Sequence, residues 1–470
     1  MNRHFKCLIN GEWIEGNGAP FEVKNPATFE IVATCANADT SQLELAVEAA
    51  EVAFKSWSTT SHQMRKEALN AIAEEIESRA SDIAKLIVEE QGKPFELAMG
   101  EVHGGLAWLR YAASQDIPVE IAEDTETKRI EIHRKPLGVV ASITPWNWPF
   151  MIAIWHIIPA LRAGNTVINK PSSLTPLSTI TLIEIMNKHL PKGVVNVITG
   201  QKGIGSGMTS HSKINKVVFT GSTPTGQSVM RNAADNLKRL TLELGGNDAA
   251  IVLKGTDVAK VAPAIFGAAF LNMGQTCGAI KRLYVHESIY EDMCAAMVAI
   301  ANDQVVGNGL DEGVNFGPVQ NQDQLTFVSD LVNAAKQGGA TVLTGGKPLQ
   351  GVGYFYPPTI VADISNEAAL VQEEQFGPAL PIIKFTNVDA AIEMANGVEV
   401  GLDASVWGPD TAEAGVIAER LECGTTFVNA HAQIQPNIPM GGCKMSGFGV
   451  EFGDEGLLEF TSLQVKHIQK

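Results

Sequence analysis

The sequence predicts an α/β protein with two domains, each built on a parallel sheet. Its 470 residues are enough for two or three domains with a large buried core. From residue 139 to 253, short apolar runs alternate with helical segments, which is the pattern of a parallel sheet with crossover helices. A second alternating region follows and reaches residues 425–428, and it predicts the second domain.

The strands expected in the two sheets are short and apolar. In the first sheet they lie at residues 139–143, 166–168, 194–198, 216–219 and 240–242. In the second sheet we expect strands at residues 249–252, 282–285 and 425–428, with a helix at residues 257–272.

The segments before the first sheet predict a hairpin, three helices and a further strand. Apolar residues flank an Asn-Gly turn within residues 8–14, which is typical of a two-residue hairpin. Residues 41–57 carry an apolar stripe at helical spacing, and Ser41 is a candidate N-cap. Residues 125–136 alternate charged and apolar side chains, so they form either a strand with one wet face or a strand that meets another subunit. The other two helices are expected at residues 63–91 and 94–113.

Composition and charge exclude several classes of protein. Hydrophobic residues make up 45% of the chain and charged residues 19%, which is typical of a globular protein. The net charge of −17 argues against nucleic acid and an anionic membrane as partners, since both need a basic surface. We see no signal peptide and no apolar run of about 18 residues, so no stable membrane insertion is expected. The six cysteines are scattered, which favours reduced thiols and a cytoplasmic location.

Cys277 is a candidate nucleophile. It lies among the small residues Gly274, Thr276 and Gly278. A thiolate can attack a carbonyl carbon and hold the product as a thioester, and backbone amides in a tight turn favour the thiolate. The alternative is a buried, inert cysteine, and this segment alone does not decide between the two.

Two polar residues near strand ends could assist a thiolate. Glu243 follows an apolar strand and precedes a glycine pair, so it is expected at the carboxyl end of a sheet, where it could activate water. Asn147 lies in a corner with two prolines and two tryptophans, and its amide could donate to an oxyanion. An exposed surface carboxylate is the alternative for Glu243.

Three segments could contact a nucleotide cofactor. Residues 219–226 follow a strand and open a helix, and glycines at such a junction let a phosphate approach backbone amides. Lys170 ends another strand and could reach ribose or phosphate oxygens, while Glu374 could bind ribose hydroxyls. The alternative for residues 219–226 is a simple strand-to-helix turn. The alternative for Lys170 and Glu374 is a solvated charge in a loop. The histidines lack metal-binding spacing, so we expect no metal site.

Taken in order, these segments resemble the NAD(P)-dependent aldehyde dehydrogenase superfamily. Each motif alone is moderately specific, but the set follows the family's order and spacing along nearly the whole chain. The matching motifs are residues 145–147, 170–172, 219–222, 243–246, 274–277, 374–378 and 441–447.

The resemblance implies two Rossmann-like domains and a small oligomerisation hairpin. The cofactor-binding domain would comprise residues 1–117 and 137–244, and the catalytic domain residues 245–456. Residues 118–136 and 457–470 would form the oligomerisation strands of a homodimer or homotetramer.

The resemblance also implies catalytic roles. Cys277 would be the nucleophile and Glu243 the base that activates water. The Asn147 amide and the backbone N–H of Cys277 would form the oxyanion hole. An aldehyde would be oxidised to a carboxylic acid through a thiohemiacetal and a thioester, with NAD or NADP taking the hydride.

Cofactor contacts follow from the same resemblance. Lys170 and Glu374 would hold the adenosine and nicotinamide riboses, Ser222 the pyrophosphate, and Phe376 would pack near the nicotinamide. Further contacts are expected from Thr144, Trp146, Ser172, Ser173, Gly203, Phe219, Gly221 and Leu244.

Two departures from the family pattern bear on specificity. Many NAD-preferring members carry a glutamate where this chain has Ser173. That carboxylate would repel the 2′-phosphate of NADP, so its absence allows NADP to bind. Members that act on succinate semialdehyde tend to carry an arginine where this chain has Leu271. We therefore expect medium- to long-chain aliphatic or aromatic aldehydes in an apolar tunnel formed by Trp148, Met151, Ile152, Trp155 and Leu271.

Three other readings compete with this one. A succinate-semialdehyde-type enzyme is disfavoured by Leu271. A CoA-acylating enzyme would transfer the acyl group to a thiol, but such members generally lack the glutamate base, which is present here as Glu243. A non-catalytic protein that kept the fold is disfavoured because every catalytic position is intact.

Overall fold

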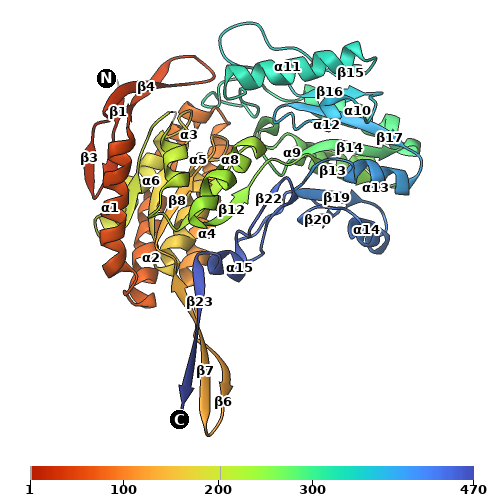
Figure 1. Ribbon diagram of the computed structural model, residues 1–470. Helices are drawn as coiled ribbons and strands as arrows, with labels where there is room; N and C mark the ends of the chain where they lie inside the picture. Colours follow the sequence, from red (N-terminus) through yellow and green to blue (C-terminus); the bar gives the residue numbers. More distant parts are fainter. Residues whose placement is uncertain (1–2, 202) are drawn as a thin grey trace.

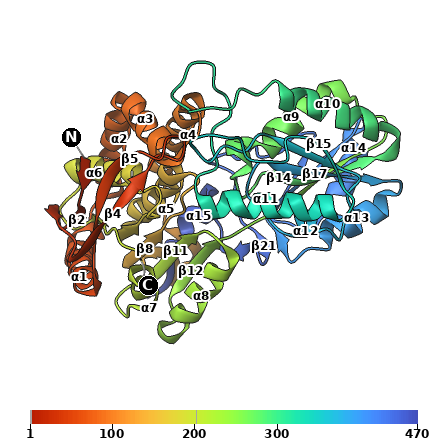
Figure 2. The ribbon, with the colours of Figure 1, turned by 90° about the horizontal axis from the view of Figure 1, so that it is seen from above.

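The computed structural model describes residues 3–201 and 203–470 and contains two α/β domains and a protruding antiparallel sheet (Figure 1). Figure 2 shows the two domains side by side. The predicted fold class is therefore confirmed. Among the described residues, no helix combines the length and apolarity that a membrane crossing needs.

The first domain is built on an eight-stranded sheet of order β22-β12-β11-β8-β9-β10-β2-β3. Its five central strands are parallel, and the chain reverses its direction of strand addition at β8. Such a switch point opens a crevice at the carboxyl ends of the strands. The strands are β2 (Cys7–Ile9), β3 (Glu12–Ile14), β8 (Val139–Ile143), β9 (Thr166–Lys170), β10 (Val195–Val197), β11 (Lys216–Thr220), β12 (Arg239–Glu243) and β22 (Gly447–Phe448).

Helices cover both faces of this sheet because the central strands are apolar on both sides and need cover from water. They are α1 (Thr40–Trp57), α2 (His62–Ser78), α3 (Ala80–Gln91), α4 (Phe95–Ser114), α5 (Pro149–Ala163), α6 (Leu177–His189), α7 (Ile204–Ser210), α8 (Thr223–Ala233) and α15 (Gly453–Leu458). A small sheet of β1 (Arg3–Phe5), β5 (Ile31–Asn37) and β4 (Gly18–Lys24) packs at the outer edge.

The second domain contains a seven-stranded sheet in which only the edge strand β15 is antiparallel. The order is β15 (Thr341–Thr344), β16 (Thr359–Ala362), β17 (Ala379–Phe385), β14 (Ile280–His286), β13 (Asp248–Val252), β19 (Asp403–Trp407) and β20 (Thr425–Val428). Its helices are α9 (Val258–Ala269), α10 (Tyr290–Asn302), α11 (Gln322–Gln337), α12 (Ala369–Gln372), α13 (Val388–Asn396) and α14 (Thr411–Ala418). A short pair, β18 (Val400–Gly401) and β21 (Cys443–Lys444), lies outside this sheet.

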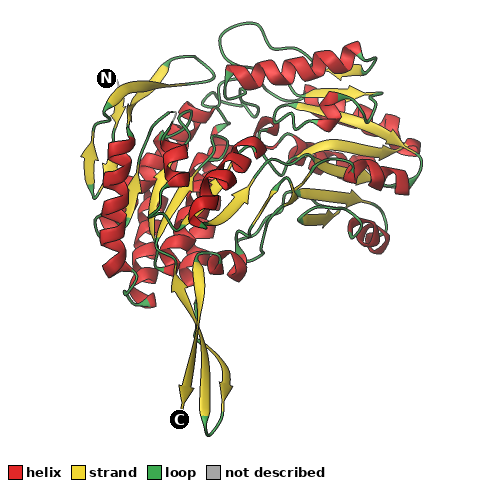
Figure 3. Cartoon of the chain, viewed as in Figure 1, coloured by secondary structure: helices red, strands yellow, loops and turns green. Residues whose placement is uncertain are grey.

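The protruding sheet joins segments from the middle and the end of the chain. Strand β7 (Lys128–Pro136) pairs antiparallel with β23 (Thr461–Gln469) over nine residues. Both strands lie within the ranges 118–136 and 457–470 in which strands were expected. A third strand, β6 (Glu120–Asp124), completes the sheet; it lies within the predicted range 118–136 but was not predicted as a separate strand. Figure 3 shows these strands projecting away from both domains.

Three predicted boundaries are wrong in detail. The N-cap of α1 is Asp39, not Ser41. The Asp39 carboxylate accepts a hydrogen bond from the backbone N–H of Gln42, and Oε1 of Gln42 accepts one from the backbone N–H of Asp39. The helix predicted at residues 63–91 breaks at Arg79 into α2 and α3. The helix predicted at residues 257–272 ends at Ala269, where the chain enters the turn that carries Cys277.

Candidate active site

A strained turn presents Cys277 between α9 and β14. Three consecutive residues, Asn272, Met273 and Gly274, have positive φ angles of 52°, 57° and 73°. A side chain at Gly274 would meet the Gly377 carbonyl at 2.3 Å, so the turn requires glycine there. The Asn272 amide offsets part of the strain by donating to the Asn147 carbonyl at 2.9 Å.

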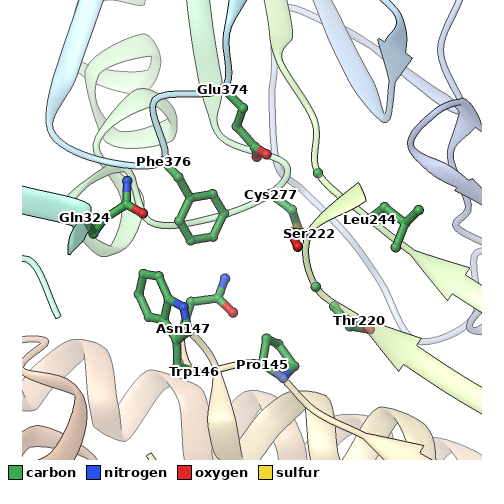
Figure 4. A pocket seen from close by; sticks show the side chains of 12 residues that line it. Pro145, Trp146, Asn147, Thr220, Ser222, Leu244, Cys277, Gln324, Glu374 and Phe376 are labelled. Atoms are coloured by element: carbon green, nitrogen blue, oxygen red, sulfur yellow. The ribbon is translucent and has the colours of Figure 1, made fainter. Parts of the chain in front are cut away.

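Cys277 lies where two cavities meet. The first, of about 250 Å³, opens at the switch point of the eight-stranded sheet (Figure 4). The second, of about 320 Å³, extends from Cys277 along α5. Besides Cys277, the first cavity is lined by Pro145, Trp146, Asn147, Thr220, Gly221, Ser222, Leu244, Gly245, Gln324, Glu374 and Phe376.

Asn147 is held rigidly beside the thiol. Its Nδ2 donates to the Gln275 carbonyl at 3.0 Å, which leaves one amide hydrogen for another acceptor. Its own carbonyl accepts from Lys93 Nζ at 2.8 Å, and Lys93 pairs with Glu101 at 2.6 Å. Both charged side chains are fully buried, so this pair ties α4 to the corner that carries Asn147.

Glu243 ends β12 as a buried carboxyl group. The residue is 7% exposed, and Oε1 has no hydrogen-bond partner in the part of the chain that the structure describes. Burial raises the pKa of Glu243 well above its usual value, and the carboxyl groups of Glu451 and Asp403 raise it further. A carboxyl group in this state can accept a proton near neutral pH. Glu243 lines neither cavity itself; the 441–449 segment passes close to its Oε1.

Glu374 and Phe376 enter the first cavity from the second domain. Glu374 Oε1 accepts from the Gly246 amide at 3.1 Å and lies 3.6 Å from Lys281 Nζ. Burial raises the pKa of Glu374 to about 7, against the effect of Lys281. Phe376 has a φ angle of 44° and meets Trp146 edge to face, with ring centroids 5.4 Å apart. Both side chains point toward Cys277 (Figure 4).

The aldehyde dehydrogenase family model matches residues 13–467. The chain belongs to this family. Aldehyde dehydrogenase LUC3 of a Fusarium species is 38% identical over 449 residues, 95% of either chain. A solved E. coli structure described as an NADP dependent enzyme is 32% identical, with a TM-score of 0.97 over 100% of this chain and 98% of that one. The NAD+ complex of a Bacillus cereus aldehyde dehydrogenase gives the same identity and TM-score, over 99% and 97%.

This aldehyde dehydrogenase is an NAD(P)-dependent oxidoreductase that converts an aldehyde to an acid. Six of its predicted cofactor residues line the first cavity, namely Trp146, Gly221, Ser222, Leu244, Glu374 and Phe376. Pro145, Thr220, Gly245 and Gln324 line it as well and were not predicted. Pro145, Thr220 and Gly245 lie inside the matching motifs at residues 145–147, 219–222 and 243–246, whereas Gln324 comes from α11 with no local signal.

The other six predicted cofactor residues do not line this cavity and lie along the sheet edge or inside it. Lys170 ends β9, its backbone carbonyl accepts from the Thr144 amide at 3.2 Å, and burial lowers the pKa of its ammonium to about 8. Gly203 caps α7, and Phe219 is buried in β11 against Gly221. Ser172 and Ser173 follow Lys170 and are partly exposed.

The second cavity of the dehydrogenase contains all five predicted tunnel residues, Trp148, Met151, Ile152, Trp155 and Leu271. Trp108 was missed, and it contacts Trp155 with ring centroids 5.5 Å apart. The lining also contains residues that were not among the predicted tunnel residues, namely Leu97, Gly100, Glu101, Thr276, Gly278, Asp403, Ala432, Ile434 and Met440. Within residues 3–201 and 203–470, no cluster of three potential metal ligands occurs.

Proposed function

We propose that this aldehyde dehydrogenase oxidises medium- to long-chain aliphatic or aromatic aldehydes. The apolar lining of the second cavity carries this proposal. Among the residues that the structure describes, no lysine or arginine lines it, and its two acidic lining residues are Glu101, neutralised by Lys93, and Asp403. A substrate with a second carboxylate would lose its hydration there without gaining a cationic partner.

We assign the catalytic steps to three residues. The Cys277 thiolate attacks the aldehyde carbon, and the free amide hydrogen of Asn147 and the Cys277 backbone N–H stabilise the oxyanion of the thiohemiacetal. A nicotinamide cofactor bound in the first cavity would supply the acceptor for the hydride of that carbon. Glu243 then takes a proton from water as the water attacks the thioester, and the acid leaves while the Cys277 sulfur regains its electron pair.

We infer that the nicotinamide end and the pyrophosphate of the cofactor occupy the first cavity. The α8 N-terminus has no side-chain cap on its amide groups, so these can meet a pyrophosphate beside Ser222. Glu374 would hold the nicotinamide ribose, Phe376 would pack near the nicotinamide, and Lys170 would hold the adenosine ribose. Supporting contacts would come from Thr144, Trp146, Ser172, Ser173, Gly203, Phe219, Gly221 and Leu244.

A substrate panel tests the proposal. Purified enzyme is assayed for cofactor reduction with octanal, dodecanal, benzaldehyde and succinate semialdehyde. We expect kcat/KM for the apolar aldehydes to exceed that for succinate semialdehyde by about 100-fold or more, because a carboxylate is desolvated without a partner. In the matched variant Leu271→Arg, the added guanidinium should bring kcat/KM for succinate semialdehyde closer to that for the apolar aldehydes. A preference of the wild-type enzyme for succinate semialdehyde would contradict the proposal, and stimulation by CoA would indicate the acylating alternative.

Ser173 tests the cofactor choice. We propose that the enzyme accepts NADP as well as NAD because no carboxylate occupies this position. Ser173→Glu should lower kcat/KM for NADP about tenfold or more and spare NAD, since the new carboxylate repels the 2′-phosphate. Ser173→Gln is the control, because glutamine has the size of glutamate without its charge. An equal kcat/KM for NADP in wild type and Ser173→Glu would show that the 2′-phosphate does not bind beside residue 173.

The protruding sheet supports a homodimer or homotetramer. Two apolar side chains of β23, Leu463 and Val465, are 58% and 52% exposed. An exposed apolar strand in a three-stranded sheet is suited to burial against a second copy.

We propose the domain ranges 1–117 with 137–244, 245–456, and 118–136 with 457–470, although β22, from the 245–456 segment, pairs with β12.

A further inference from the structure

Lys281 is a buried cation beneath the loop that carries Cys277. It is the second residue of β14 and only 1% exposed. Its Nζ donates hydrogen bonds to the Thr276 carbonyl at 2.6 Å and to the Cys277 carbonyl at 3.2 Å. An ammonium group has three donors, and the third can face Glu374 Oε1, which lies 3.6 Å away.

These hydrogen bonds fix the peptide group on which catalysis depends. The Thr276 carbonyl and the Cys277 N–H belong to one planar trans peptide, so they point in opposite directions. An ammonium that holds the carbonyl therefore sets the direction of the N–H proposed for the oxyanion hole. It also polarises the peptide, which strengthens that N–H as a donor.

Lys281 also counters the negative groups around the thiol. Burial raises the pKa of Cys277 to about 12, and Lys281 opposes this rise. The carboxyl groups that face the thiol come from three other segments: Glu374 before β17, Asp403 on β19 and Asp248 on β13. Each of these raises the pKa of Cys277 further.

We propose that Lys281 is a positioning residue for Cys277, which orients the Cys277 amide through two backbone carbonyls and supplies the positive charge that favours the thiolate. This inference rests on the proposed role of Cys277 as nucleophile. Its test needs neither aldehyde nor cofactor, so its outcome is distinct from that of the substrate panel.

The test is the pH dependence of Cys277 alkylation by iodoacetamide in the full-length enzyme. The thiolate displaces iodide and forms a C–S bond, and mass spectrometry of the Cys277 peptide measures the rate. In Lys281→Met, which keeps the length of the side chain without its charge, we expect the profile to move about one unit toward higher pH. The rate at a fixed pH below the midpoint should fall about tenfold.

Two further variants separate charge from folding. Lys281→Gln can still donate to a carbonyl and should show the same shift, whereas Lys281→Arg keeps the charge and should restore most of the wild-type profile. The partly exposed Cys423 provides an internal reference in each sample. A folded Lys281→Met or Lys281→Gln variant with the wild-type profile would overturn the proposal. So would a lower rate at every pH with no shift, because that result indicates a purely structural role.

Discussion

Cys277→Ala is expected to reduce aldehyde oxidation by about 10⁴-fold or more while the protein stays folded. Among the described residues, Cys277 alone lines both cavities, so we expect its thiol to meet both the aldehyde and the cofactor. None of the five other cysteines lines either cavity, and no second thiol can replace it. Loss of the thiol therefore removes the covalent route itself, whereas loss of an assisting group only slows a step.

The measurement is cofactor reduction with octanal, with thermal unfolding to confirm the fold. Cys423→Ala removes a different partly buried thiol and should keep normal turnover. Cofactor binding, followed by quenching of tryptophan fluorescence, should be retained in Cys277→Ala because Trp146 and the other lining residues are unchanged. Turnover within tenfold of wild type would show that another group attacks the aldehyde.

Local sequence signals were sufficient for the elements that hold this site. Apolar runs predicted β8, β9, β11 and β12, because a strand covered on both faces is mostly apolar. Small residues around Cys277 indicated a tight turn, and the structure shows positive φ angles just before it. The tunnel residues on α5 were predictable because they follow the Pro-Trp-Asn corner directly in the chain.

Residues that reach the site through tertiary packing carried no such signal. Lys281 sits in an apolar strand, and only the folded loop reveals its two carbonyl partners. Trp108 lies on α4, about 40 residues before α5 in the chain, and its place in the tunnel depends on how these two helices pack. The break at Arg79 was missed because both flanking segments have helical periodicity and no proline or glycine separates them. The roles proposed for the site residues, the domain ranges and the cytoplasmic location stay predictions.

Glu243 is one of several buried carboxyl groups whose pKa is raised by burial, and it is the one that ends β12. At the end of β12 its side chain is largely buried, and among the described residues Oε1 has no hydrogen-bond partner. The resulting rise in the pKa of Glu243 makes the ionised form a stronger base than an exposed glutamate. Rising pH converts the neutral acid to this base, so thioester hydrolysis should increase with pH through the raised pKa and fall on the acidic side.

Glu243→Gln should therefore block the second half of the reaction and spare the first. Attack by Cys277 and cofactor reduction do not need this base, so rapid mixing should give a burst of about one reduced cofactor per active site. Steady turnover after the burst should fall about 100- to 10,000-fold, because water is no longer activated. The exposed Glu413→Gln variant should turn over normally. Steady turnover of Glu243→Gln close to wild type would assign water activation to another residue, whereas a lost burst would place Glu243 in the first half of the reaction.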